Sequence, residues 1–174
     1  MDACCNPGVI IVDMQENFLR PLEPLRAEML VGNQLRLLGY CADYDLPVAV
    51  LEYSGEGPTQ REILEAVGRV PRSEYFIRNG FNSGFLNTCL PQTLKSWGVE
   101  TVIISGVNAH ACVFANAEWA KMNGYGVMTS ACLMDDIYDK DYSQWYVQCL
   151  FEPRGWNVPY FWGELQAIYP SIVR

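Results

Sequence analysis

The sequence predicts a three-layer α/β/α domain built on a doubly wound, mostly parallel sheet of about six strands. Short β-branched runs recur along the chain without polar alternation, which is typical of strands buried on both faces by helices. Segments with helical spacing lie between these runs, so strands and helices alternate as in α/β folds. Half of the 174 residues are hydrophobic and no linker divides them, so we expect a single domain over residues 1–174.

Five runs have the length and composition of buried strands, and a sixth strand is expected at a sheet edge. The runs are Val9–Val12, Pro47–Leu51, Tyr75–Ile77, Val102–Ile104 and Val127–Met128, with the edge strand near Asn157–Phe161. In a parallel sheet with right-handed crossovers, the carboxyl ends of the strands meet at one edge. We therefore expect any functional site along that edge.

Three longer segments have the periodicity of amphipathic helices. They are Pro24–Tyr44, Leu86–Trp97 and Ala111–Asn123. The last two are followed by glycine, which accepts the left-handed conformation that often ends a helix. The C-terminal segment, about residues 136–174, is atypical because it is rich in aromatic residues, and we expect a short helix around Tyr142–Leu150 there. This segment is expected either to cover the sheet edge or to supply a subunit contact.

Composition excludes several classes of function. Twelve basic against twenty acidic residues give a net charge of −8, which disfavours nucleic acid and anionic membrane surfaces as partners. The seven cysteines are odd in number, no CxxC spacing occurs and no secretory signal precedes them, which indicates free thiols in the cytoplasm. Common cofactor motifs are missing and the chain has one histidine, so we expect no cofactor and no metal.

Two residues at predicted strand ends carry reactive groups. Asp13 follows the first strand, where burial would raise the pKa of its carboxyl group and favour base chemistry; a helix cap or a turn is the alternative. Cys112 lies where the helix after the fourth strand begins, so free backbone N–H groups and the helix dipole would stabilise its thiolate. The alternative for Cys112 is a buried structural cysteine.

Longer stretches around these two residues resemble the isochorismatase-like cysteine hydrolases. The resemblance rests on DMQ after the first strand, on the NSGF segment, and above all on GVNAHACVFANAEWAKMNGYGV between Gly106 and Val127. It covers roughly Val9 to Asp135, and the superfamily includes nicotinamidases and N-carbamoylsarcosine amidohydrolases. The resemblance implies a metal-independent hydrolase that cleaves a C–N bond of a small amide or ureido-type substrate. Because members are commonly dimers or tetramers, it also implies a homo-oligomer.

The resemblance also implies roles for individual residues. Cys112 would be the nucleophile that forms a covalent intermediate, and Asp13 the base that takes its proton and later activates water. A non-proline cis peptide bond would join Val107 to Asn108. The backbone N–H groups of Asn108 and Cys112 would form the oxyanion hole.

One departure from the family pattern affects the catalytic set. The position of the family lysine, counted back from the NSGF segment, reads Asn79, with Arg78 just before it. We place Asn79 with Asp13 and Cys112 as catalytic. Arg78 would supply the missing positive charge only if the strand shifted by one residue, because neighbouring side chains point to opposite faces. A third alternative is that catalysis is lost and the protein binds a small metabolite or a partner.

Five residues near these strand ends are candidates for substrate binding: Gln15, Phe18, Glu52, Arg78 and Phe85. Where nicotinamidases carry histidine ligands for zinc, this sequence reads Glu52-Tyr53-Ser54-Gly55-Glu56, which predicts no transition-metal site. His110 points away from Cys112 and is expected to pack or to form a hydrogen bond, and Asp135-Asp136 is expected to form a solvated turn. Hydrolysis of a vinyl ether, which isochorismatases perform without needing the cysteine, is a further alternative.

Overall fold

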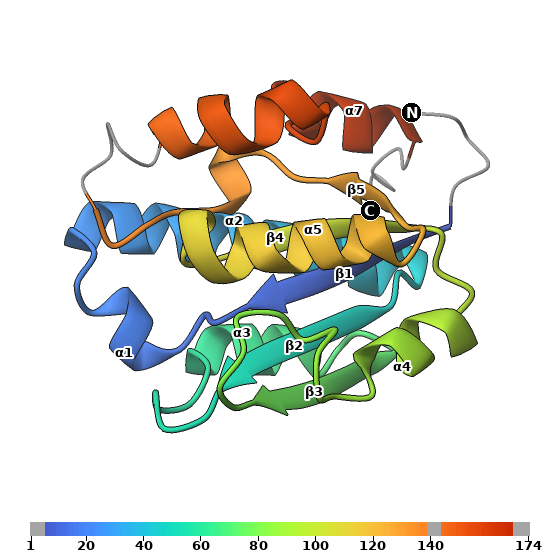
Figure 1. The fold of residues 1–174 in the computed structure, drawn as a ribbon, viewed down its shortest axis with the longest axis horizontal. Helices are drawn as coiled ribbons and strands as arrows, with labels where there is room; N and C mark the ends of the chain where they lie inside the picture. Colours follow the sequence, from blue (N-terminus) through green and yellow to red (C-terminus); the bar gives the residue numbers. More distant parts are fainter. Residues whose placement is uncertain (1–5, 139–143, 169–174) are drawn as a thin grey trace.

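The computed structural model describes residues 6–138 and 144–168, which fold around one parallel sheet (Figure 1). Five strands form the sheet in the order β3-β2-β1-β4-β5. They are β1 (Pro7–Val12), β2 (Val48–Tyr53), β3 (Ser73–Arg78), β4 (Thr101–Gly106) and β5 (Gly126–Met128). The doubly wound α/β fold expected from the sequence is confirmed, with every strand pair parallel.

Helices cover both faces of the sheet. The α-helices are α1 (Glu16–Leu19), α2 (Pro24–Tyr44), α3 (Arg61–Val67), α4 (Leu90–Ser96), α5 (Phe114–Met122) and α7 (Phe161–Ile168). The shorter turns are η1 (Ala109–Val113), η2 (Ala131–Leu133), η3 (Val147–Phe151) and η4 (Glu152–Arg154). Buried side chains of α2, α3 and α7 pack on one face, and those of α4, α5 and η3 pack on the other. Within the two described ranges, no helix has the length and apolar character needed to cross a membrane.

Two predicted elements differ from the structure, and a third falls partly outside the described residues. The helix expected over Leu86–Trp97 begins only at Leu90, because the residues before it form turns and Pro91 occupies the first helical turn. The predicted edge strand is reduced to an isolated bridge between Asn157 and Thr129, so the sheet has five strands among the described residues. Helix is present from residue 144 onward in the C-terminal segment, whereas residues 142–143 of that prediction lie outside the described ranges.

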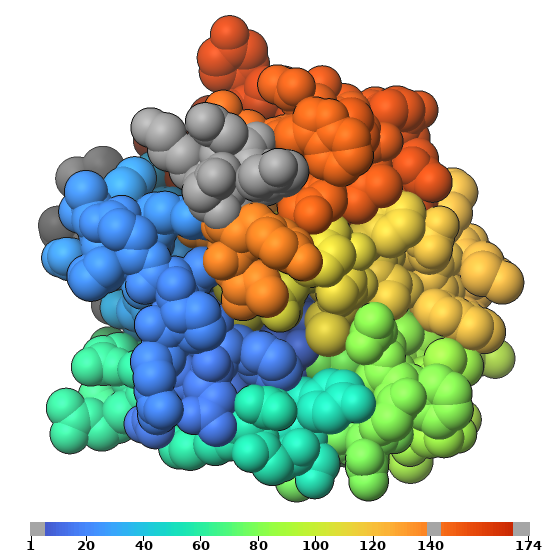
Figure 2. Space-filling model, turned by 60° about the vertical axis from the view of Figure 1, so that its left-hand side comes forward, coloured from blue at the N-terminus to red at the C-terminus, as the bar shows by residue number. Residues whose placement is uncertain are grey.

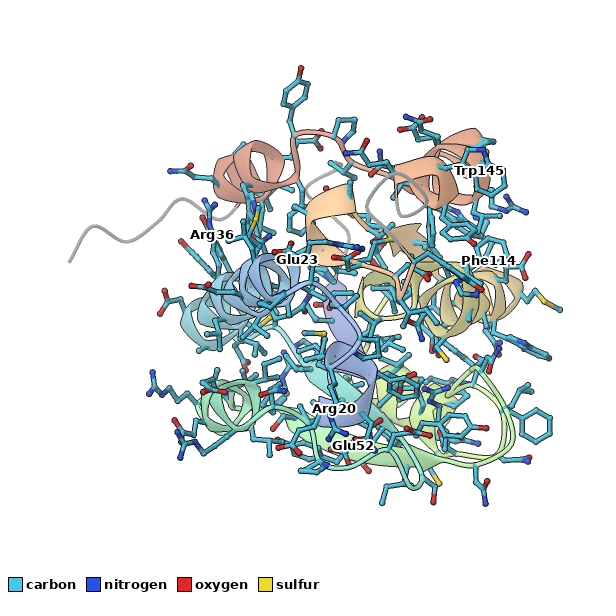
Figure 3. All side chains as sticks on the ribbon, turned by 90° about the vertical axis from the view of Figure 1, so that its left-hand side faces the viewer. Arg20, Glu23, Arg36, Glu52, Phe114 and Trp145 are labelled. Atoms are coloured by element: carbon cyan, nitrogen blue, oxygen red, sulfur yellow. The ribbon has the colours of Figure 1, made fainter. Side chains whose placement is uncertain are left out.

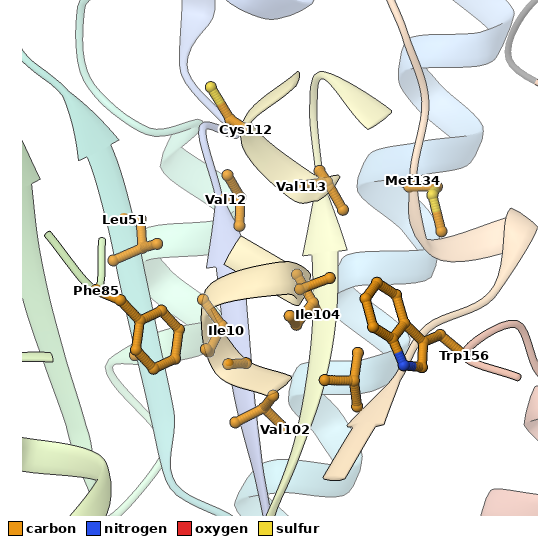
Figure 4. Close-up of a cluster of buried hydrophobic side chains, with 14 of the residues drawn as sticks. Ile10, Val12, Leu51, Phe85, Val102, Ile104, Cys112, Val113, Met134 and Trp156 are labelled. Carbon is orange, nitrogen blue, oxygen red and sulfur yellow. The ribbon is translucent and has the colours of Figure 1, made fainter. Parts of the chain in front are cut away.

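Alternating side chains of β1 fill two separate apolar layers. Ile10 and Val12 face the layer beneath α5, together with Ile104 of β4 (Figure 4). Val9 and Ile11 face the opposite layer beneath α2. Because both faces are covered, Val9–Val12 of β1 are fully buried and the carboxyl end of β1 is held beside that of β4.

Gly106 allows the ends of β1 and β4 to meet closely. Its φ is +120°, and a Cβ atom placed on it would lie 1.9 Å from the carbonyl oxygen of Val12. The same carbonyl oxygen accepts a hydrogen bond from the N–H of Val107 at 3.0 Å. A side chain at position 106 would therefore separate the two strand ends.

We expect Gly106→Ala to lower the free energy of unfolding by about 3 kcal/mol or more, because the methyl group cannot coexist with the β1 carbonyl. Gly32→Ala in α2 is the matched control, since Gly32 is exposed and a Cβ atom there meets nothing within 4 Å. The control should gain about 0.5–1 kcal/mol from improved helix propensity. Urea unfolding of both variants measures the difference, and similar stabilities would contradict the close approach.

Candidate active site

Three strand ends bring Asp13, Arg78 and Cys112 together at the carboxyl edge of the sheet. Asp13 follows β1 with a φ of +53°, and its side chain is fully buried. Arg78 is the last residue of β3, and its Nη2 donates a hydrogen bond to Oδ1 of Asp13 in a fully buried ion pair. Cys112 lies in η1 after β4 and is buried beside this pair, where its thiol interacts with both charged groups.

Arg78, and not Asn79, is the residue of β3 that reaches the site. Arg78 pairs in register with Tyr53 of β2, and its side chain passes across β2 to reach Asp13. Asn79 follows the strand and is exposed outside this cluster. The expectation that Arg78 needs a one-residue shift of the strand is therefore wrong, because the regular register already turns its side chain toward Asp13.

The guanidinium group of Arg78 is held on several sides. Its Nη1 donates to the carbonyl oxygens of Phe81 at 3.0 Å and of Asn82 at 2.6 Å, and its Nη2 donates to Asp13. The aromatic ring of Tyr53 lies 5.3 Å from its central carbon, which adds a cation–π contact. The arginine therefore both neutralises the buried carboxylate and fixes the loop after β3.

Burial controls the acidity of the two proton-bearing groups in the cluster. It raises the pKa of Asp13, and the charge and hydrogen bond of Arg78 offset only part of this effect. Burial and the neighbouring carboxylate of Asp13 raise the pKa of Cys112 to about 12, against the lowering effect of Arg78. Desolvation and the Asp13 carboxylate therefore both oppose the thiolate that the sequence led us to expect at Cys112.

Several polar atoms of the cluster have no hydrogen-bond partner. Five buried side-chain atoms in the described part of the chain lack one, and three belong here: Asp13 Oδ2, Arg78 Nε and Asn108 Oδ1. The backbone N–H of Asn108 likewise donates to no acceptor among the described residues. Buried polar groups are nearly always paired, so these atoms are suited to a small polar molecule. Figure 4 shows the sulfur of Cys112 pointing away from the apolar side chains of Val12 and Ile10.

The turn between β4 and Cys112 has the backbone that the family resemblance implied. The peptide bond between Val107 and Asn108 is cis. The backbone of Asp135 brackets this turn, since its N–H donates to the carbonyl oxygen of Gly106 at 3.2 Å and its carbonyl oxygen accepts from the N–H of Ala109 at 2.9 Å.

Asp135 and Asp136 do not form the solvated turn expected from the sequence. Asp136 is fully buried and accepts hydrogen bonds from the backbone N–H and the Nδ1 of His110. Asp135 forms an ion pair with Arg26 of α2. His110 packs and forms a hydrogen bond as expected, since its ring also stacks on that of Tyr146.

Two predicted substrate-binding residues are used to hold loops. The side chain of Gln15 donates to the carbonyl oxygens of Tyr53 at 3.0 Å and of Gly57 at 2.5 Å, and accepts from the N–H of Tyr53 at 2.6 Å. Glu52 accepts from the N–H of Thr59 at 3.0 Å and from its hydroxyl at 2.7 Å. The Gln15 bonds join the loops after β1 and β2, whereas the Glu52 bonds, both to its Oε1, hold the loop after β2.

The two predicted aromatic residues have different environments. Phe18 is half-buried and meets the ring of Tyr53 edge-on at 6.5 Å, and the Tyr53 ring in turn lies beside Arg78. Phe85 is buried in the core beneath α5 and contacts Tyr125. In Figure 2, the dark-blue segment around α1, the teal loop after β2 and the yellow segment around η1 and α5 meet on one face of the molecule.

Figure 3 looks onto the same edge of the sheet. Glu52 lies on the side of β2 and α1, and Phe114 and Trp145 lie on the side of α5 and the C-terminal segment. The site therefore lies between two groups of elements that are far apart in the sequence.

Asn116 is a buried residue of the site that sequence reasoning missed. Its Oδ1 accepts from the N–H of Gly84 at 2.9 Å, and its Nδ2 donates to the carbonyl oxygens of Cys112 at 2.8 Å and of Asn82 at 3.2 Å. It thereby joins the loop after β3 to the turn that carries Cys112. The sequence feature that could have identified it is an asparagine four residues after Cys112, on the same side of the predicted helix as the core.

Comparison with known proteins places these features in a family. The family model "Isochorismatase domain" matches residues 7–142. Phenazine biosynthesis protein PhzD of Pseudomonas fluorescens is 30% identical over 134 residues, which are 66% of this chain and 64% of that protein. Phenazine biosynthesis protein PhzD1 of Pseudomonas aeruginosa is 28% identical over 135 residues. The chain thus spans about 64% of the length of these curated relatives.

Solved structures share the fold at low sequence identity. YcaC of Escherichia coli, described as an octameric hydrolase of unknown specificity, has a TM-score of 0.81 at 20% identity, covering 98% of this chain and 82% of its own. The nicotinamidase SaPncA of Staphylococcus aureus has a TM-score of 0.77 at 16% identity, covering 89% and 99%. With the family model matching most of its length, this chain belongs to the isochorismatase family.

Proposed function

We propose that this protein is a hydrolase that cleaves a C–N bond of a small amide or ureido-type substrate, without metal, through a covalent intermediate on Cys112. The observation that carries the proposal is the buried cluster in which Asp13, Arg78 and Cys112 meet. Family membership supports a hydrolase, and the nicotinamidase from Staphylococcus aureus has the same fold. The cytoplasmic location and the homo-oligomer expected from the sequence stay predictions.

In the proposed acylation, Asp13 accepts the thiol proton as the sulfur of Cys112 attacks the substrate carbonyl carbon. The C–S bond forms and the carbonyl π electrons move to the oxygen, which the N–H groups of Asn108 and Cys112 stabilise. The C–N bond then breaks, and the amine leaves with the proton that Asp13 returns. In the second step Asp13 deprotonates water, which attacks the thioester, releases the acid and restores the thiol.

Arg78 takes the place of the family lysine in this proposal. Its charge stabilises ionised Asp13 and lowers the pKa of Cys112 relative to a site without it. Burial is the largest single effect on the pKa of Arg78 and lowers it, but the charge and hydrogen bond of Asp13, together with the interactions of Cys112, raise the pKa overall. The arginine therefore stays protonated throughout and acts by charge and position, not by proton transfer.

Hydrolysis of a vinyl ether is a second candidate, and one observation favours it. Burial raises the pKa of both Asp13 and Cys112, so a protonated Asp13 would be available as a general acid while the thiol stays inert. The match to the isochorismatase family model agrees with this reaction. The two candidates assign opposite protonation states to Asp13, which makes them separable.

p-Nitrophenyl acetate tests the covalent mechanism. We expect a burst of one p-nitrophenolate per active site, because acylation of Cys112 precedes slower hydrolysis of the thioester. Cys112→Ala should abolish the burst, and Asp13→Asn should slow it by about 100-fold or more through loss of the base. Wild-type protein without a Cys112-dependent burst would reject the covalent mechanism, and absence of any hydrolysis would favour the binding-protein alternative.

The pH dependence of kcat/KM separates the two candidates. If Asp13 acts as a base, it must be ionised, so activity on the ester falls as pH drops through its raised pKa. If Asp13 acts as an acid, activity on a vinyl ether such as isochorismate falls as pH rises through the same pKa. Stopped-flow rates across the acidic range measure the direction in which activity changes with pH. Activity that falls as pH rises, and that is fully kept in Cys112→Ala, would contradict the amide hydrolase.

Alkylation with iodoacetamide tests the electrostatic coupling directly. Asp13→Asn removes the carboxylate that raises the pKa of Cys112 while Arg78 remains, so labelling of Cys112 between about pH 7 and 9 should speed up. Arg78→Met should slow it, whereas Arg78→Lys keeps the charge and is the matched control. Peptide mass spectrometry measures the labelling of each thiol separately. Cys41 is the reference, because burial raises its pKa to about 12 without a contribution from Asp13 or Arg78. Unchanged labelling in Asp13→Asn would refute the coupling.

A further inference from the structure

We propose that Asp136 is a positioning residue for the nucleophile turn, acting on η1 partly through His110. This inference rests on the proposed function, because it concerns how Cys112 is held for attack. Asp136 comes from the segment after η2, and no step of the mechanism above uses it. Its carboxylate is nevertheless fully buried, directly beside the start of η1.

Asp136 contacts the turn at two kinds of atom. Its Oδ2 accepts from the backbone N–H of His110 at 3.0 Å and also meets Nδ1 of the His110 ring. Its Oδ1 accepts from the N–H of Tyr138 at 3.4 Å. A carboxylate that accepts a hydrogen bond from a backbone N–H at the start of a helix gives that donor a partner. Its negative charge also interacts favourably with the positive end of the helix dipole. The backbone bond and the ring contact together fix where η1 begins.

The segment that carries Asp136 is itself anchored from α2. Arg26 donates to the carboxylate of Asp135 and to the carbonyl oxygen of Asp136, the latter at 3.0 Å. The N–H of Asp136 in turn donates to the carboxylate of Asp135 at 2.7 Å. Asp136 is therefore tied to α2 through Arg26 and Asp135, independently of its contact with the turn that leads to Cys112.

His110 transmits this contact without touching the reacting atoms. It lies two residues before Cys112, so the two side chains face different directions. Its ring stacks on Tyr146 with centroids 4.9 Å apart and planes 25° apart, and 31% of the side chain is exposed. Tyr146 comes just before η3, so the C-terminal segment packs against the ring that Asp136 orients.

The consequence is a rate effect and not a binding effect. Asp13 is fixed at the end of β1, whereas the sulfur of Cys112 and the N–H of Asn108 both belong to the turn that Asp136 holds. If the turn relaxes, the sulfur and the oxyanion donor move together relative to the base. Small displacements of reacting groups lower the rate of the chemical step much more than they lower affinity.

The acylation phase with p-nitrophenyl acetate measures this effect. We expect Asp136→Asn to lower the maximal acylation rate about tenfold, and Asp136→Ala to lower it further because the backbone acceptor is lost as well. The ester concentration at half-maximal rate and the burst amplitude should stay as in the wild type. Asp45→Asn is the control for the chemical change alone, because Asp45 is an exposed aspartate at the end of α2 that pairs with Arg72.

His110→Ala is a second variant that tests the same proposal without replacing the buried carboxylate of Asp136. Because His110 is partly exposed, this variant is expected to fold, and its acylation rate should fall like that of Asp136→Asn. In the double variant the two effects should not add, since both act on the same contact between Asp136 and the His110 ring: the first weakens it and the second removes it. Additive effects, or an unchanged acylation rate in His110→Ala and Asp136→Asn, would overturn the proposal. A wild-type protein without any burst would instead overturn the proposed function.

Discussion

The buried ion pair between Asp13 and Arg78 is the interaction on which the rest of the site depends. A carboxylate with no exposed surface is strongly destabilising unless a charge of opposite sign lies beside it. Arg78 supplies that charge from a strand two positions away in the sheet, and the carbonyl oxygens of Phe81 and Asn82 occupy another of its nitrogens. The pair therefore joins β1 to β3 and fixes the loop that faces Cys112 through Asn116.

Around this pair, polar side chains of neighbouring loops form hydrogen bonds with one another, whereas several polar atoms of the site itself have no hydrogen-bond partner. Gln15 joins the loops after β1 and β2, and Oε1 of Glu52 holds the loop after β2. Asp136 does the same for the turn after β4. The unpaired polar atoms are concentrated on Asp13, Arg78 and Asn108, which is the distribution expected where a substrate completes the hydrogen bonds.

Much of the fold and the two reactive residues were predictable from local patterns, and the remainder depended on register and distant partners. Asp13 and Cys112 follow buried apolar strands, so their place at the sheet edge follows from topology. A shift of the strand by one residue decides whether Arg78 or Asn79 faces the site. The apolar periodicity of so short a strand does not define that register. The burial of Asp136 was not predictable, because its partner is a backbone N–H 26 residues earlier in the chain.

The position of Arg78 also bears on how a thiol with a pKa of about 12 would react in the proposed mechanism. Burial makes Cys112 a weaker acid, but it also makes Asp13 a stronger base, so the difference between the two pKa values grows less than the cysteine value suggests. Arg78 interacts with both groups. When the proton moves from sulfur to carboxylate, the negative charge shifts in the opposite direction but stays next to the same guanidinium. The negative charge, on Asp13 before the transfer and on Cys112 after it, therefore stays paired with the positive charge of Arg78. A proton exchange in a buried site requires such an arrangement.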